Sequence, residues 1–265
     1  MRNWIGLSFA LAMAAPAAAQ PPELKLWRLD CGAIDFPDFD VFSDTYLYPG
    51  LHKQLTVSCY LIKHGGQYLL WDSGVAGPDK DGDVTVTLKR RVTDQLKQVG
   101  VSPGQINFLG ISHYHYDHSG QAADFPGATL LIGSGDWDAL KGNSERAARF
   151  APWMSGGSKV EPVSRDKDVF GDGSVTILDM PGHTPGHKAL LVRLRSGPVL
   201  LSGDLYHATE QVANRGVPSF NTNRADTLAS FDRFQAIARN AKAKVIIQHE
   251  MNDIAKLPAF PHAAE

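Results

Sequence analysis

Seven residues of this chain have the types and spacing of a metal centre. Four of them lie within six positions, in an H-x-H-x-D-H run made of His113, His115, Asp117 and His118. The other three follow later strand-like segments and are His183, Asp204 and His249. Imidazole nitrogens and carboxylate oxygens bind zinc, and also manganese, iron or cobalt. Four residues of ligand type within six positions are hard to explain as ordinary surface residues, and they predict a site for divalent metals.

The spacing suggests how two metals would share these ligands. Residues i and i+2 of an extended segment point the same way, so His113 and His115 can bind one metal together. Asp117 and His118 follow where the chain turns toward a helix, and they can face a second metal. Two metals about 3.5–4 Å apart need a bridging ligand. Asp204 can be that bridge, because its carboxylate has two oxygens to share. The complete set of ligands favours a metal-dependent hydrolase.

The remaining histidines differ in their support. His183 lies in a P-G-H-T-P-G-H motif, and His249 follows a buried strand-like segment. His187 shares the motif with His183, and we expect it to hydrogen-bond behind the ligands or to pack. Three others have no partner pattern and are treated as ordinary: His52, His64 and His262.

The N-terminus has the pattern of a secretory signal peptide. Arg2 provides a positive charge, residues 4–15 are nearly all apolar, and an Ala-rich end predicts cleavage after Ala19. We therefore expect residues 20–265 to form a single exported domain, periplasmic or secreted. No other apolar stretch reaches membrane length. The net charge of −2 provides no basic surface for nucleic acid.

Two cysteines, Cys31 and Cys59, leave two alternatives open. In an oxidising compartment they could pair. Each lies in an apolar strand-like segment, however, and free cysteine is among the most buried residue types, which favours two reduced thiols.

The order of elements predicts an α/β fold of the α+β type. Strand-like runs cover 24–29, 56–63, 68–72, 106–111, 128–132, 160–163, 175–179, 189–195, 199–202 and 243–247. Helical spacing covers 85–99 and 224–240, and a short helix begins at 136–140. Two halves of similar content suggest an αββα sandwich, with two mixed sheets face to face and helices outside. All the candidate ligands then fall on loops after strands, where catalytic groups are common.

Residues 141–158 read as an irregular Gly/Ser-rich segment that contains Phe150, Trp153 and Met154. These three side chains indicate either a local hydrophobic anchor or a loop on the substrate side of the metals.

The motifs together resemble the metallo-β-lactamase superfamily. The H-x-H-x-D-H run, P-G-H-T-P-G-H, S-G-D and a late strand-end histidine occur in the same order over essentially the whole mature chain. Within that superfamily the chain is most similar to the N-acyl-homoserine lactonases. Supporting stretches are Ser58-Cys-Tyr-Leu-Ile62, Leu70-Trp-Asp-Ser-Gly74, Ser202-Gly-Asp-Leu-Tyr-His207 and Phe220-Asn-Thr-Asn-Arg224.

The resemblance implies two metal ions, most simply zinc, and a small-molecule substrate. His113, His115 and His183 would bind one ion, Asp117, His118 and His249 the other, and Asp204 would bridge them. A bridging hydroxide, available because bound metal lowers the pKa of water toward about 7, would attack the lactone carbonyl. Asp117 would orient this hydroxide and carry its proton.

One position departs from the lactonase pattern. The lactonases place a tyrosine three residues after the bridging aspartate, whereas this chain has His207 there and Tyr206 one position earlier. Alternation points the two side chains in opposite directions, so we expect His207 to contact the substrate carbonyl, with Tyr206 as the alternative. A third possibility is that neither contacts substrate. Tyr116 is expected to line the acyl pocket.

Other functions of the same fold remain alternatives. A β-lactamase would also be exported, but those enzymes generally lack a bridging carboxylate such as Asp204. A phosphotriesterase resembling methyl parathion hydrolase fits both the ligands and the export. A glyoxalase II would need a longer C-terminal region. A non-catalytic metal-binding or redox module is a further alternative, although redox members tend to have Glu where this chain has His115. A homodimer is compatible with the sequence.

Overall fold

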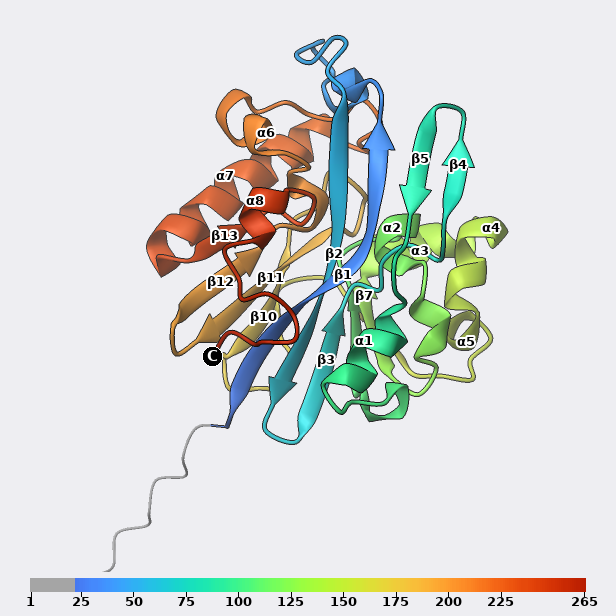
Figure 1. The fold of residues 1–265 in the computed structure, drawn as a ribbon, viewed down its shortest axis with the longest axis vertical. Coiled ribbons are helices and arrows are strands. Elements are labelled where there is room, and N and C mark those ends of the chain that lie inside the picture. The colour runs from blue at the N-terminus through green and yellow to red at the C-terminus, as the bar shows by residue number, and fades with distance from the viewer. Residues whose placement is uncertain (1–21) are drawn as a thin grey trace, which may run out of the picture.

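The computed structural model describes residues 22–265, so the expected signal peptide lies outside the described residues. Two β-sheets face each other, and helices cover the outer side of each, as Figure 1 shows. The αββα sandwich expected from the order of elements is confirmed.

The first sheet is formed by β1 (Leu24–Phe36), β2 (Lys53–His64), β3 (Gln67–Trp71), β4 (Asp79–Asp81), β5 (Val84–Thr87), β6 (Phe108–Ile111), β7 (Thr129–Gly133) and β8 (Val160–Val163). Their order is β4-β5-β1-β2-β3-β6-β7-β8. The pairs from β3 to β8 are parallel and the others antiparallel, so the sheet is mixed.

The second sheet is formed by β9 (Lys167–Asp168), β10 (Val175–Asp179), β11 (Lys188–Leu194), β12 (Gly197–Leu201) and β13 (Lys244–Ile246). Their order is β13-β12-β11-β10-β9, and only the β12–β13 pair is parallel among the described strands of this sheet.

The α-helices are α1 (Val92–Gln98), α2 (Tyr116–Ser119), α3 (Ser134–Lys141), α4 (Ser144–Ala147), α5 (Ala151–Met154), α6 (Thr209–Asn214), α7 (Arg224–Ala241) and α8 (Met251–Ile254). Short 3-10 turns are η1 (Phe39–Phe42), η2 (Pro103–Gln105), η3 (Ala122–Asp124), η4 (Ala148–Phe150) and η5 (Gly203–Leu205). Among residues 22–265, no helix has the length and apolar character needed to cross a bilayer.

Strand β2 shows how alternation builds the layers. Its neighbouring residues Tyr60 and Leu61 are both fully buried, yet they face opposite sides of the sheet. Tyr60 packs between the two sheets with Leu190 of β11, whereas Leu61 packs on the outer side with Leu96 of α1. Because both faces of the first sheet are covered, its central strands are nearly continuous apolar runs.

Helix α7 covers the outer face of the second sheet. Its N-cap residue is Asn223, whose side-chain Oδ1 accepts a hydrogen bond from the Asp226 N–H at 3.1 Å. Phe231 and Phe234 are buried against Leu191 and other β11–β12 residues. Burial of each large apolar side chain contributes about 1.5–3 kcal/mol, so this face fixes the helix in place.

Two expectations about local structure were wrong. The helix expected over 85–99 begins only at Val92, because Val84–Thr87 pairs with β1 as strand β5. The segment 141–158 is not irregular, since it contains α4, η4 and α5. Phe150 and Trp153 are buried in the core outside the first sheet, which supports the anchor interpretation for them.

The expectation of two reduced cysteines was also wrong, because Cys31 and Cys59 form a disulfide with a Cα–Cα distance of 5.9 Å. The cause is the register of β1 and β2. Leu29 lies opposite Cys59 and Asp30 opposite Ser58, and Cys31 is the extra residue of a bulge between Asp30 and Gly32, within bonding reach of Cys59.

Candidate metal centre

The seven candidate ligands come together at one edge of the two sheets. His113, Asp117 and their neighbours follow β6, the loop after β10 provides His183, and Asp204 lies in η5 directly after β12. His249 follows β13. The side chains form two groups, in each of which the ligand atoms lie within 4.8 Å of one another. The groups are His113, His115, His183 and Asp204, and Asp117, His118, Asp204 and His249.

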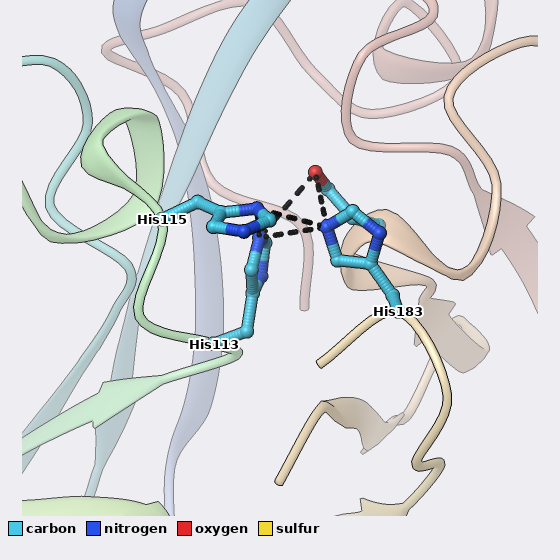
Figure 2. A group of neighbouring side chains, drawn as sticks. His113, His115 and His183 are labelled. Carbon is cyan, nitrogen blue, oxygen red and sulfur yellow. Dashed lines mark hydrogen bonds and ion pairs between the residues drawn. The ribbon is translucent and has the colours of Figure 1, made fainter. Parts of the chain in front are cut away.

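The first group is a triangle of imidazole nitrogens. Figure 2 shows the rings of His113, His115 and His183 converging. His115 Nδ1 lies 3.0 Å from both His113 Nε2 and His183 Nε2, and those two nitrogens are 3.2 Å apart. Asp204 Oδ2 lies 3.5 Å from His113 Nε2 and from His183 Nε2.

The second group uses the other oxygen of the same carboxylate. Asp204 Oδ1 lies 2.9 Å from the Nε2 atoms of both His118 and His249. Those two nitrogens are 3.2 Å apart, and Asp117 Oδ2 lies 3.4 Å from each. Asp204 thus directs one oxygen into each group, which is the arrangement of a bridging ligand.

The outer ring nitrogens determine what the inner ones can bind. His118 Nδ1 donates to Asp72 Oδ2 at 2.9 Å, His183 Nδ1 to Asn221 Oδ1 at 2.8 Å and His249 Nδ1 to the Thr56 carbonyl at 2.8 Å. A neutral imidazole has one N–H, so in the neutral form of each ring Nε2 presents a lone pair to the group. Lone pairs facing each other at about 3 Å repel unless a cation lies among them. Asp204 Oδ1 is buried and receives no hydrogen bond from residues 22–265, so the residues present fit divalent cations.

The protonation tendencies agree with the ligand chemistry. Burial holds the pKa values of His113 and His183 well below the ordinary value, and lowers the pKa of His115 to about 4. Burial also acts on His118 and His249, but the carboxylates of Asp204 and Asp117 prevail and raise their pKa values. Metal must displace protons from these two rings, so its affinity will fall at low pH.

Close backbone contacts hold the ligand loops together. A Cβ atom on Gly133 would overlap the backbone of Gly186, so the end of β7 can meet the P-G-H-T-P-G-H loop because residue 133 is glycine. A Cβ atom on Gly186 would in turn overlap the Asp136 backbone nitrogen. Asp136 of α3 joins the same loops. Its carboxylate accepts from the Tyr114 N–H at 3.0 Å, the Thr184 hydroxyl at 2.9 Å and the Gly186 N–H at 2.6 Å.

His187 lies behind the ligands, as expected, and contacts the backbone of one of them. Its Nδ1 donates to the Met180 carbonyl at 2.9 Å, and its Nε2 accepts from the Asp204 N–H at 2.9 Å. Burial lowers the pKa of His187 to about 3, which keeps this acceptor neutral. Gly203 has φ +55°, and a Cβ there would lie 2.6 Å from His187 Nε2, so the turn requires glycine.

The structure separates His207 from Tyr206. His207 is buried between the two groups, with its ring centroid 5.1 Å from that of His183 and 5.6 Å from that of His249. Its Nε2 lies 3.1 Å from Asp204 Oδ2, and its Nδ1 is unpartnered among the described residues. The Tyr206 ring stacks on Phe231 at 4.5 Å, and its hydroxyl accepts from Gln235 Nε2 at 3.2 Å. Tyr206 therefore packs beneath α7, away from the ligands, and the alternative that it contacts substrate is not supported.

A cavity of about 220 Å³ opens onto the ligands. One side is apolar, formed by Ile34, Phe36, Phe42, Leu55 and Phe220. The other side is formed by ligands and their neighbours, His115, Tyr116, Asp117, Asp204, His207 and His249. Tyr116 is 43% exposed and lines this cavity. The site thus combines a polar, metal-binding floor with an apolar wall.

Sequence reasoning missed the residues that orient the ligands. Asp72 and Asn221 lie in stretches already recognised as supporting the resemblance, but no spacing rule connects them to His118 or His183. Gln248 is another such residue, and its position directly before His249 was the one available signal.

Comparison with known proteins agrees with the geometry. A family model described as the metallo-beta-lactamase superfamily matches residues 52–249. N-acyl homoserine lactonase AttM of Agrobacterium fabrum is 30% identical over 242 residues, covering 80% of this chain and 88% of that protein. An N-acyl homoserine lactonase of a Bacillus species is 28% identical, covering 81% of this chain and 89% of the relative.

Solved structures share the fold. An N-acyl homoserine lactone hydrolase with N-hexanoyl-L-homoserine at its catalytic metal centre has a TM-score of 0.78 at 22% identity, covering 90% of this chain and 98% of that one. AidC, described as a dizinc quorum-quenching lactonase, has a TM-score of 0.66 at 20% identity, covering 92% and 90%.

Proposed function

This chain belongs to the metallo-beta-lactamase superfamily, and on that premise we propose that it opens the lactone ring of N-acyl homoserine lactones. The proposal rests on the position of Asp204, whose carboxylate directs one oxygen to each of two groups of candidate ligands. These groups lie beside a cavity with one apolar wall. The names of the curated relatives support the substrate class.

We propose two divalent ions at the site, zinc by preference, with manganese, iron or cobalt as alternatives. His113, His115 and His183 would hold one, Asp117, His118 and His249 the other, and Asp204 both. When bound, the ions supply Lewis acidity, which lowers the pKa of water toward about 7 and polarises an ester carbonyl.

The residues of the chain divide the remaining work. Burial and the nearby His118 act in opposite directions on Asp117, and its pKa remains below the ordinary value, so the carboxylate can accept a proton. Asp117 would take the proton of the attacking water and return it to the ring oxygen after the acyl–oxygen bond breaks. The products are a carboxylic acid and a free hydroxyl, and the acid then releases its proton to solvent and becomes a carboxylate.

His207 and the apolar wall would orient the substrate. The His207 ring lies beside the Asp204 oxygen that faces the first group, so a proton on it can be donated to the developing oxyanion. The wall of Ile34, Phe42 and Phe220 would take the acyl chain, because burial of each methylene contributes about 0.8 kcal/mol.

An activity panel tests the proposal. Mature protein, prepared metal-free and reloaded with zinc or cobalt, would be assayed on hexanoyl-homoserine lactone, nitrocefin and paraoxon. We expect lactone turnover to dominate and two metals to be bound per chain. Strong paraoxon turnover without lactone turnover would overturn the substrate, and clearly fewer than two metals would overturn the binuclear centre.

We also propose that residues 1–19 are a signal peptide and that the enzyme works in the periplasm or outside the cell. The Cys31–Cys59 disulfide supports this, because disulfides persist in oxidising compartments. Fractionation and N-terminal sequencing of the processed protein would test it, with Gln20 as the expected first residue. An uncleaved protein in the cytoplasm would contradict it.

A further inference from the structure

Gln248 is fully buried between the two sheets, and both atoms of its amide are used. Its Oε1 accepts from the Gly203 N–H at 3.0 Å and from Trp71 Nε1 at 3.3 Å. Its Nε2 donates to Asp72 Oδ2 at 2.9 Å and to the Ser58 carbonyl at 3.3 Å. An amide has two donors and one oxygen acceptor, so this side chain has no capacity left for a substrate or a metal.

Two of these contacts, with Asp72 and with Gly203, lead to a ligand of the second group. Asp72 Oδ2, which receives the Gln248 amide, also receives His118 Nδ1 at 2.9 Å. Gly203 directly precedes Asp204 in the chain, and Gln248 itself directly precedes His249. The Gln248 amide is therefore linked to three of the four ligands in that group. It reaches His118 through Asp72 and Asp204 through Gly203, and His249 is the next residue in the chain.

The ring partners of the first group are not bonded to the Gln248 side chain. His183 Nδ1 donates to Asn221, and the His113 Nδ1 atom lies 3.1 Å from the Ser112 hydroxyl. No hydrogen bond joins Gln248 to either of these histidines or to His115 among the described residues. The two groups share Asp204, and the Ser112 hydroxyl lies 3.1 Å from the Nδ1 atoms of both His113 and His118. Gln248, however, contacts the acceptor of a ligand histidine only in the second group, where it donates to Asp72.

We propose that Gln248 is a positioning residue that sets the metal affinity of the second group, made of Asp117, His118, Asp204 and His249, and leaves the first group largely unaffected. The inference rests on the proposed function in that it requires two ions. Loss of the amide would leave the Gly203 N–H unpaired and would free the Asp72 carboxylate to rotate away from His118. Loss of a partner behind a ligand typically weakens metal binding about 10–100-fold.

The test is a zinc titration of the metal-free mature chain carrying Gln248→Met, in competition with a chromogenic chelator. Methionine keeps the length of the side chain and removes its hydrogen bonds. We expect one of the two dissociation constants to rise about 10–100-fold and the other to change by less than about threefold. In the cobalt-loaded protein, paramagnetically shifted Nδ1–H signals should assign the weakened ion to His118 and His249.

A matched control is Gln95→Met. Gln95 is also buried, and it exchanges two hydrogen bonds with the Asp30 backbone far from the ligands. This variant should lose comparable thermal stability with both metal affinities unchanged. If Gln248→Met does not fold, Asp72→Asn interrupts the same contact at its next residue and should weaken the same ion selectively.

The outcomes separate the inference from the proposed function. Equal weakening of both ions in Gln248→Met, or no weakening, would overturn the positioning role, as would a wild-type chain that binds one ion. Selective weakening in a protein that binds two ions but does not hydrolyse lactones would support the positioning role and overturn the lactonase assignment.

Discussion

Replacement of His187 by phenylalanine should destabilise the metal-free protein by an amount that depends on pH. The ring keeps its approximate size, but the Asp204 N–H and the Met180 carbonyl lose their partners at 2.9 Å. Each buried polar group left unpaired costs about 1–3 kcal/mol, so at neutral pH the free energy of unfolding should fall by about 2–6 kcal/mol. In a domain of this size that corresponds to a drop in melting temperature of at least about 4 °C.

The pH dependence follows from the lowered pKa of His187. Burial lowers it from the ordinary 6.5 to about 3, so between these values the unfolded chain binds more protons than the native one. Stability from a neutral His187 is complete above pH 6.5 and is lost as the pH falls toward 3. His187→Phe has no such loss, so the difference between the two proteins should shrink by about 2 kcal/mol from pH 6.5 to pH 5.

Urea unfolding of both proteins in EDTA, from pH 7.5 to pH 5, would measure this. His52→Phe is the matched control, since the His52 side chain is 64% exposed and its loss should change stability by less than about 0.5 kcal/mol. A His187→Phe protein as stable as wild type at pH 7.5 would contradict the role of these two hydrogen bonds. A difference in unfolding free energy that does not vary with pH would contradict the lowered pKa of His187.

Three further outcomes are expected. Asp117→Asn should lose most lactonase activity and still bind metal, measured by turnover and metal analysis; retained activity would remove Asp117 as the proton carrier. Asp136→Asn should abolish the fall in stability expected as pH rises from 3.8 toward 6, since burial raises the Asp136 pKa to about 6 and the native state then holds the extra proton; an unchanged slope in urea unfolding would contradict this. Replacement of Cys31 and Cys59 by serine should lower stability by about 3–4 kcal/mol, because the disulfide closes a loop of 28 residues; thermal unfolding with and without reductant would measure it, and equal melting temperatures would argue against the bond.

The sequence predicted which candidate ligands lie together, because metal binding leaves a local pattern. His113, His115, Asp117 and His118 lie on one short loop, so their spacing alone shows which side chains can face the same ion. The sheets and α7 were predicted for the same reason, since alternation and helical spacing are local. The bridging position of Asp204 was predicted from its carboxylate, which has two oxygens to share, and the resemblance implied the same position.

The rest depends on contacts between distant segments. The Val-Thr-Val-Thr run of β5 has strand character, whereas the residues that follow it have helical spacing. Pairing with β1, which no local pattern predicts, determines that the run forms a strand. Asp72 reaches His118 across 46 residues, and Gln248 reaches Asp72 across 176. No pattern along the chain reports the register that brings Cys31 beside Cys59.

The anchored outer nitrogens of the ligand histidines have a calorimetric consequence. Their acceptors, Asp72, Thr56 and Asn221, come from separate elements, so the rings are oriented before any ion arrives. Metal uptake then buries little new apolar surface, and its heat capacity change should be near zero. The measured enthalpy should instead vary with the ionisation enthalpy of the buffer, because His118 and His249 release protons as the ions enter.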